Sequence, residues 1–100
     1  MTSAYAEHRD VVEQQLFDVF TRIVRSRDEV DFFRAELGLA VQGVERADER
    51  MAESQTPLAQ IDCRAARKRV ENAERGVNTA RRQLEDLEEA RDRLLTKLVG

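Results

Sequence analysis

The chain has 100 residues, of which 41% are hydrophobic and 37% are charged, and it contains only four Gly and one Pro. So few turn-forming residues exclude a β-sandwich, which needs a turn about every 8–12 residues. The 17 basic and 20 acidic residues are interspersed and give a net charge of −3, which excludes a large single-sign field of the kind that recruits nucleic acid or anionic lipid. This composition favours long helices.

The first predicted element is a helix over about residues 4–53. From Val12 onwards, residues at alternating steps of four and three are apolar, and Ser26 is the only polar one among twelve such positions. We call these the seam positions of the first helix: Val12, Leu16, Val19, Ile23, Ser26, Val30, Phe33, Leu37, Ala40, Val44, Ala47 and Met51. A heptad pattern sustained over this length predicts a left-handed coiled coil.

A single strong break follows, at Ser54-Gln55-Thr56-Pro57, which contains the only proline. Proline is tolerated at the first position of a helix, because its missing N–H would have no partner there. Threonine just before it is a good N-cap. We therefore expect a turn at about residues 54–56 and a second helix that begins at Pro57.

The second predicted helix covers about residues 57–98 and repeats the pattern. Its seam positions are Ala59, Cys63, Ala66, Val70, Ala73, Val77, Ala80, Leu84, Leu87, Arg91, Leu94 and Leu98. Only Arg91 is charged. The two seams together predict an all-α fold: a long antiparallel two-helix coiled-coil hairpin that forms one domain over residues 1–100.

The register of the hairpin also follows from the seams. In an antiparallel pair each seam residue faces one from the other helix, and centring the turn on Gln55 pairs residues whose numbers add to 110. This register places Ala47 opposite Cys63 and Phe33 opposite Val77. Nearly every pair close to the turn combines an Ala with a larger residue, which lets the two backbones approach closely.

Several apolar side chains lie outside the seams, most of them towards the ends of the chain. An exposed apolar patch is unusual on a soluble protein and commonly marks an interaction surface. We predict such a surface from Val11, Phe17, Phe20, Val24, Phe32, Leu95 and Val99. A homodimer that forms a four-helix bundle is the expected use of this surface. Docking of a different protein and a monomer that leaves its Phe side chains exposed are the alternatives.

The sequence lacks a set of residues for catalysis. Cys63 occupies a seam position, where we expect a small buried apolar residue, and His8 is expected in solvent. A two-helix hairpin is also expected to offer no cavity. We therefore expect no enzyme activity, catalytic residue, cofactor or metal site. Arg91 and Ser26 either fix the register and oligomeric state or are merely tolerated. We expect Arg91 to reach solvent or to pair with an acid, either one such as Asp18 or one from a partner chain.

Charge and targeting signals narrow the function. The basic run Arg64, Arg67, Lys68 and Arg69, with Arg46 and Arg50 from the facing helix, is interleaved with acids and lacks an exposed aromatic, so nucleic acid is not an expected partner. The N-terminus does not read as a signal peptide, and no apolar run is long enough for membrane insertion, so we expect a cytoplasmic protein. Arginine accounts for 15 of the 17 basic residues, which indicates a bacterial source.

The sequence favours a non-enzymatic structural or adaptor protein that self-associates and binds an unknown protein partner. Through Asp48, Glu49 and Glu53 the hairpin resembles the acidic-tipped coiled coils that enter the RNA polymerase secondary channel, which implies a regulator of transcription machinery or nucleic acid as an alternative. In size and architecture it also resembles the small Trp-x-Gly proteins of type VII secretion, although its comparable triplet, Val41-Gln42-Gly43, lies inside the first helix. That resemblance implies a leaderless secreted helical-hairpin protein.

Overall fold

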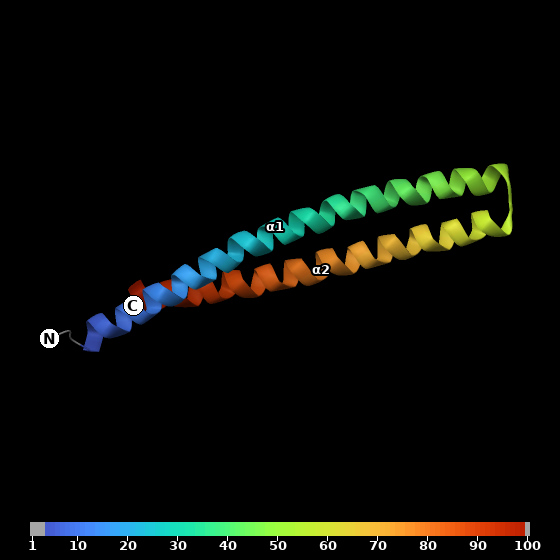
Figure 1. Ribbon diagram of the computed structural model, residues 1–100. Coiled ribbons are helices and arrows are strands. Elements are labelled where there is room, and N and C mark those ends of the chain that lie inside the picture. The colour runs from blue at the N-terminus through green and yellow to red at the C-terminus, as the bar shows by residue number, and fades with distance from the viewer. Residues whose placement is uncertain (1–3, 100) are drawn as a thin grey trace. The chain divides into compact units, whose positions relative to one another are not determined.

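The computed structural model describes residues 4–99, which form two helices, α1 (Ala4–Glu53) and α2 (Pro57–Val99). Next to the turn at residues 54–56, α2 runs back antiparallel to α1 (Figure 1). Residues 4–99 contain no strand. The predicted all-α helical hairpin is confirmed. Within the same residues, neither helix has an apolar stretch that could cross a membrane.

The turn is held by the hydrogen bonds expected at two helix ends. At the start of α2, the hydroxyl Oγ1 of Thr56 accepts a hydrogen bond of 3.1 Å from the backbone N–H of Ala59. Pro57 takes the first helical position, where no N–H is needed. At the end of α1, the N–H of Ser54 donates to the carbonyl of Arg50 at 3.0 Å. Thr56 therefore acts as the N-cap predicted from the sequence.

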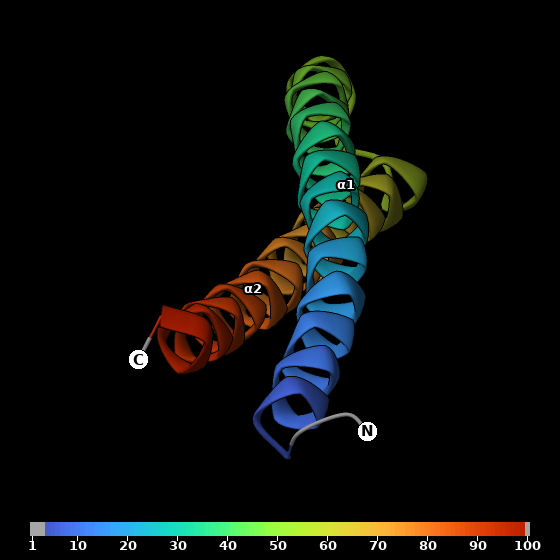
Figure 2. The same cartoon turned by 90° about the vertical axis from the view of Figure 1, so that its left-hand side faces the viewer.

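The residues form two compact units. The turn unit is Glu29–Thr79, which contains the turn and the parts of α1 and α2 next to it. The terminal unit combines Met1–Asp28 with Ala80–Gly100, of which residues 4–28 and 80–99 are described. Figure 2 presents the terminal unit towards the viewer, with its segment of α1 in blue and its segment of α2 in orange and red.

In the terminal unit, the buried side chains are those of the predicted seams. Val12 and Ile23 are each 2% exposed, and Leu16 and Ser26 are also buried. The facing segment of α2 contributes half-buried side chains at its seam positions: Leu84, Leu87, Arg91, Leu94 and Leu98. Burial therefore follows the alternation of four and three that the sequence shows, and most of the neighbouring positions are exposed.

The core of the turn unit is built from small residues. Ala47, Cys63 and Ala66 are buried against one another, and Val44 and Met51 pack on them. The thiol of Cys63 donates to the carbonyl of Ala47 across 3.4 Å, so these two residues face each other as the register predicts. Because Ala and Cys have short side chains, the two helix axes can approach closely here, which is consistent with dense interior filling.

A different arrangement fills the other end of the turn unit. The ring of Phe33 lies directly against Gly76, one residue from the predicted partner Val77, and a Cβ added to Gly76 would come within 2.6 Å of the ring atom Cε1. Phe33 also contacts the ring of Phe32 edge-on, with ring centroids 5.3 Å apart at an angle of 75°. The missing side chain of Gly76 therefore provides the space that this aromatic ring occupies.

Candidate protein-binding surfaces

The terminal unit carries exposed apolar side chains on one of its faces. Phe17, Phe20 and Val24 each follow a seam residue of α1 by one position, and Leu95 and Val99 do the same on α2. In an antiparallel helix pair, the positions that follow the seams of both helices lie on the same face, because each helix turns in the same right-handed sense. We call these five residues the terminal patch. All are exposed, from 40% for Leu95 to 90% for Val99.

Two residues of the predicted interaction surface lie elsewhere. Val11 precedes the seam residue Val12, and this places it on the face of the helix pair opposite to the terminal patch. Phe32 belongs to the turn unit, where it packs against Phe33. Five of the seven predicted residues are thus brought to one face, and sequence proximity alone had grouped the other two with them.

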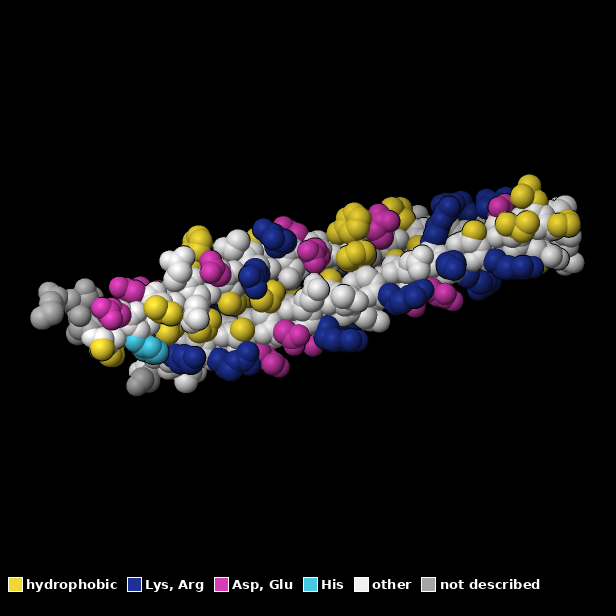
Figure 3. Space-filling view, turned by 60° about the horizontal axis from the view of Figure 1, so that its bottom comes forward, with side chains coloured by type: hydrophobic (Ala, Val, Ile, Leu, Met, Phe, Trp, Pro, Cys, Tyr) yellow, Lys and Arg dark blue, Asp and Glu magenta, His cyan; other side chains and the backbone are white. Residues whose placement is uncertain are grey.

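Charged side chains lie among the apolar ones on the face that Figure 3 draws. Figure 3 shows Lys and Arg side chains interspersed with Asp and Glu, and hydrophobic side chains in separate groups between them. Beside the terminal patch, Nε of Arg9 bonds to Glu13 at 3.0 Å. An apolar centre with a charged margin is the usual composition of a protein-binding surface.

The seam arginine is held by its own helix. Nε of Arg91 lies 3.1 Å from Asp92 and its Nη2 lies 4.0 Å from Glu88. The suggested partner Asp18 takes no part in these ion pairs. Arg91 therefore stays half-buried along its stem while its guanidinium reaches acids at the edge of the seam.

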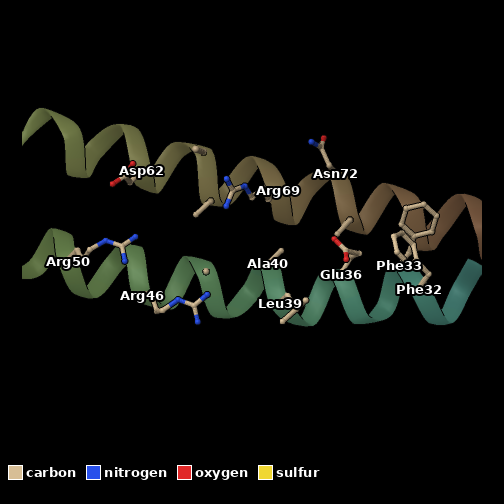
Figure 4. Close-up of a pocket in the computed structure, with 14 residues that line it drawn as sticks. Phe32, Phe33, Glu36, Leu39, Ala40, Arg46, Arg50, Asp62, Arg69 and Asn72 are labelled. Carbon is tan, nitrogen blue, oxygen red and sulfur yellow. The ribbon is translucent and has the colours of Figure 1, made fainter.

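The turn unit contains an open groove of about 740 Å³, so the expectation that a two-helix hairpin offers no cavity is wrong. Its floor is formed by small seam residues, Ala40, Ala66 and Ala73. Its walls are the positions that precede the seams: Phe32, Glu36, Leu39, Gly43, Arg46 and Arg50 on α1, and Asp62, Ala65, Arg69 and Asn72 on α2. Figure 4 shows the walls, with Phe32 and Phe33 at one end and Arg50 and Asp62 at the other.

The walls of the groove hold five charged side chains that are not paired with one another. Arg46, Arg50, Arg69, Glu36 and Asp62 form no ion pair within 4.0 Å among residues 4–99. The signal for this groove in the sequence is weak, because charged walls interrupt any apolar periodicity. It consists of two small residues, Gly43 and Ala65, in neighbouring positions of the two helices.

Elsewhere in the turn unit, one ion pair joins the two helices. Nη2 of Arg67 on α2 lies 3.1 and 3.2 Å from the two carboxylate oxygens of Asp48 on α1. The same carboxylate lies 3.7 Å from the thiol of Cys63. Burial raises the pKa of this thiol above its ordinary value of 9.0, and the nearby Asp48 raises the pKa further. The thiol is therefore held in its neutral, weakly nucleophilic form.

Residues 4–99 contain no group of three His, Cys, Asp or Glu side chains arranged to hold a metal ion. Comparison of the chain with protein-family models, with curated proteins and with solved structures gives no match.

Proposed function

We propose that the chain is a non-enzymatic structural or adaptor coiled-coil protein that self-associates through the terminal patch and connects partner proteins. The observation that carries the proposal is the gathering of five exposed apolar side chains on one face of the terminal unit. Fully burying a Phe, Leu or Val side chain contributes about 1.5–3 kcal/mol. A patch of this kind therefore favours association over exposure to water.

The placement of the patch supports a second copy as its occupant. Its residues lie directly beside the seams, so each helix of the terminal unit carries an apolar stripe that is wider than a two-helix contact needs. Stripes of this width are typical of helices that pack against two neighbours, as in a four-helix bundle. Two copies of the patch would complete such a bundle as a homodimer.

Two valines on α1 offer a matched test of this dimer. Val24 lies in the terminal patch and is 60% exposed, whereas Val11 lies on the opposite face and is 56% exposed. Because a carboxylate in an apolar interface is costly, we expect Val24→Asp to weaken self-association by at least about tenfold and Val11→Asp to leave it unchanged. Sedimentation velocity in about 0.5 M NaCl, where surface ion pairs are screened, measures the mass of each chain.

The outcomes separate the possible occupants of the patch. A dimer for the wild-type and Val11→Asp chains, with a monomer for Val24→Asp, supports the homodimer. A wild-type chain that stays monomeric at concentrations on the order of 100 µM would overturn the homodimer. Circular dichroism of all three chains checks that the helices are intact, since both valines are exposed and neither substitution should unfold the hairpin.

A further inference from the structure

Along each wall of the groove in the turn unit, the charged side chains on the two sides of the centre have opposite signs. The centre is formed by Gly43 on α1 and Ala65 on α2, which line the groove between Phe32 and Arg50 on α1 and between Asp62 and Asn72 on α2. On α1, Arg50 lies seven residues after Gly43, and Glu36 lies seven residues before it. Two positions at equal distances from the centre of one helix thus carry opposite charges.

The second wall repeats the pattern. On α2, Asp62 lies three residues before Ala65 and Arg69 lies four residues after it. A two-fold rotation about an axis that crosses both helices at Gly43 and Ala65 would bring Arg50 of one copy onto Glu36 of another. The same rotation would bring Asp62 onto Arg69. Each dimer formed in this way contains four pairs of opposite charges, because every pair occurs twice.

We propose that this groove is a self-complementary docking surface whose occupant is a second copy of the chain, placed antiparallel with α1 on α1 and α2 on α2. Charge complementarity is the argument for this occupant. The inference goes beyond the proposed dimerisation through the terminal patch, since it assigns a second self-association surface in a different unit. A chain with two such surfaces forms assemblies larger than a dimer.

The other two-fold arrangement fits the charges less well. An axis parallel to the helices would stack α1 of one copy on α2 of the other at the same level. Arg46 would then meet Asp62, but Arg69 would meet Leu39 and Glu36 would meet the uncharged Asn72. Unpaired charges in an interface are unfavourable. The perpendicular axis is the better arrangement, because it leaves only Arg46 among the five charged side chains without an opposite charge.

The centre of the groove has room for the close approach that this dimer requires. A Cβ added to Gly43 would meet nothing within 4 Å, and the adjoining Ala65 has a single methyl group. The perpendicular axis also places the stem of Arg46 over Leu39, which is 60% exposed and would be covered by it. The small centre and the charged ends therefore belong to one arrangement.

The small size of the surface is typical of weak, transient interfaces. From Phe32 to Arg50 the groove spans about 27 Å of helix, and two helices side by side are about 20 Å wide. The face therefore buries about 500 Å² per copy, which lies at the small end of specific interfaces. We expect a dissociation constant in the micromolar range rather than below it.

The test uses charge reversal in full-length Val24→Asp chains, which lack the dimer proposed for the terminal patch. In about 50 mM NaCl we expect these chains to dimerise through the groove. Glu36→Arg and Arg50→Glu should each weaken that dimer by at least about tenfold, because each homodimer then contains two pairs of like charges. An equimolar mixture of the two single variants should restore the dimer, because every pair in the mixed dimer has opposite charges.

An ion pair between residues 36 and 50 of the same chain cannot explain restoration of the dimer in the mixture. Residues 36 and 50 are separated by about 21 Å along α1, which is too far for an ion pair in the same molecule. The matched controls are Glu74→Arg and Arg64→Glu, two exposed residues that follow the seam and so lie on the face opposite to the groove. These reversals should change the dissociation constant little, alone or mixed.

Sedimentation velocity over a concentration series distinguishes the outcomes. The proposal is overturned if the Val24→Asp chain stays monomeric at about 100 µM in low salt, or if mixing does not restore the dimer. Neither result bears on the proposed dimer of the terminal patch, because the self-association of that dimer is measured in high salt with the groove residues unchanged. Conversely, a terminal patch that proves inert leaves the mixing experiment as a valid test of the groove.

Discussion

At the scale of single residues, the packing of Phe33 depends on the absence of a side chain at Gly76. The ring of Phe33 occupies the space next to Gly76, and a methyl group there would overlap three ring carbons. Glycine inside a helix costs about 1 kcal/mol relative to alanine, so propensity alone would favour replacement. The contact with Phe33 opposes that preference and gives Gly76 a specific role in the turn unit.

A pair of glycine substitutions tests this role. Gly38 is exposed and a Cβ there would meet nothing, so Gly38→Ala should raise the free energy of unfolding by up to about 1 kcal/mol. Gly76→Ala should lower it, because the displaced ring costs about 1–3 kcal/mol, more than the gain in propensity. Denaturant unfolding at one fixed protein concentration measures both. Equal stabilisation by the two substitutions would show that Phe33 moves aside freely.

At the scale of the helices, the seams were predictable and the groove was not. The alternation of four and three directly reports which residues a helix buries, and every seam position of α1 and α2 is buried or half-buried. The groove is lined by the positions one residue earlier, where Glu36, Arg46 and Arg69 carry charges and the sequence has no apolar period to reveal it. A hollow there depends on how far two alanine-rich backbones approach, which is a three-dimensional property.

The terminal patch falls between these cases. Its aromatic residues were visible in the sequence as an apolar surplus, but membership of a face depends on the offset of each residue from the seam. Val11 precedes a seam residue and Phe17 follows one, so the two lie on different faces although only six positions separate them. Sorting the surplus by that offset as well as by its place along the chain would have separated the five residues of the patch from Val11 and from the apolar residues of the turn unit.

The register between α1 and α2 can be tested with a disulfide. The pairing that matches Ala47 with Cys63 also matches Ala40 with Val70, and both of these residues are half-buried in the turn unit. In a Cys63→Ser chain, we expect the pair Ala40→Cys and Val70→Cys to oxidise readily, because facing positions bring the two Cα atoms within disulfide range. Non-reducing electrophoresis reports the internal cross-link.

The control for this cross-link combines Ala40→Cys with Ala59→Cys. Residues 59 and 70 are separated by about 16 Å along α2, so the control pair should stay reduced under the same oxidant. Equal oxidation of both pairs, or preferential oxidation of the control, would contradict the register.

At the scale of the whole molecule, the two surfaces use different physics. The terminal patch is apolar, so the association that we propose for it depends on burying surface and is not weakened by added salt. The groove is lined by five charged side chains, and the association that we propose for it depends on ion pairs between these side chains and those of a second copy. Interactions between partly exposed charges weaken as the Debye length falls from about 14 Å at 50 mM salt to about 4 Å at 0.5 M.

This difference predicts that salt controls the size of the assembly. In about 50 mM NaCl both surfaces should be occupied, so the wild-type chain should form species larger than a dimer, with a mean mass that rises with concentration. In about 0.5 M NaCl the two copies should separate at the groove, and the chain should sediment as a dimer held by the terminal patch. The Glu36→Arg chain should be a dimer at both salt concentrations, because its groove pairs are already broken. A wild-type mass that does not change with salt would contradict the proposal that the groove associates through ion pairs and the terminal patch through apolar contacts. A mass that rises with salt would show that apolar contacts dominate at both surfaces.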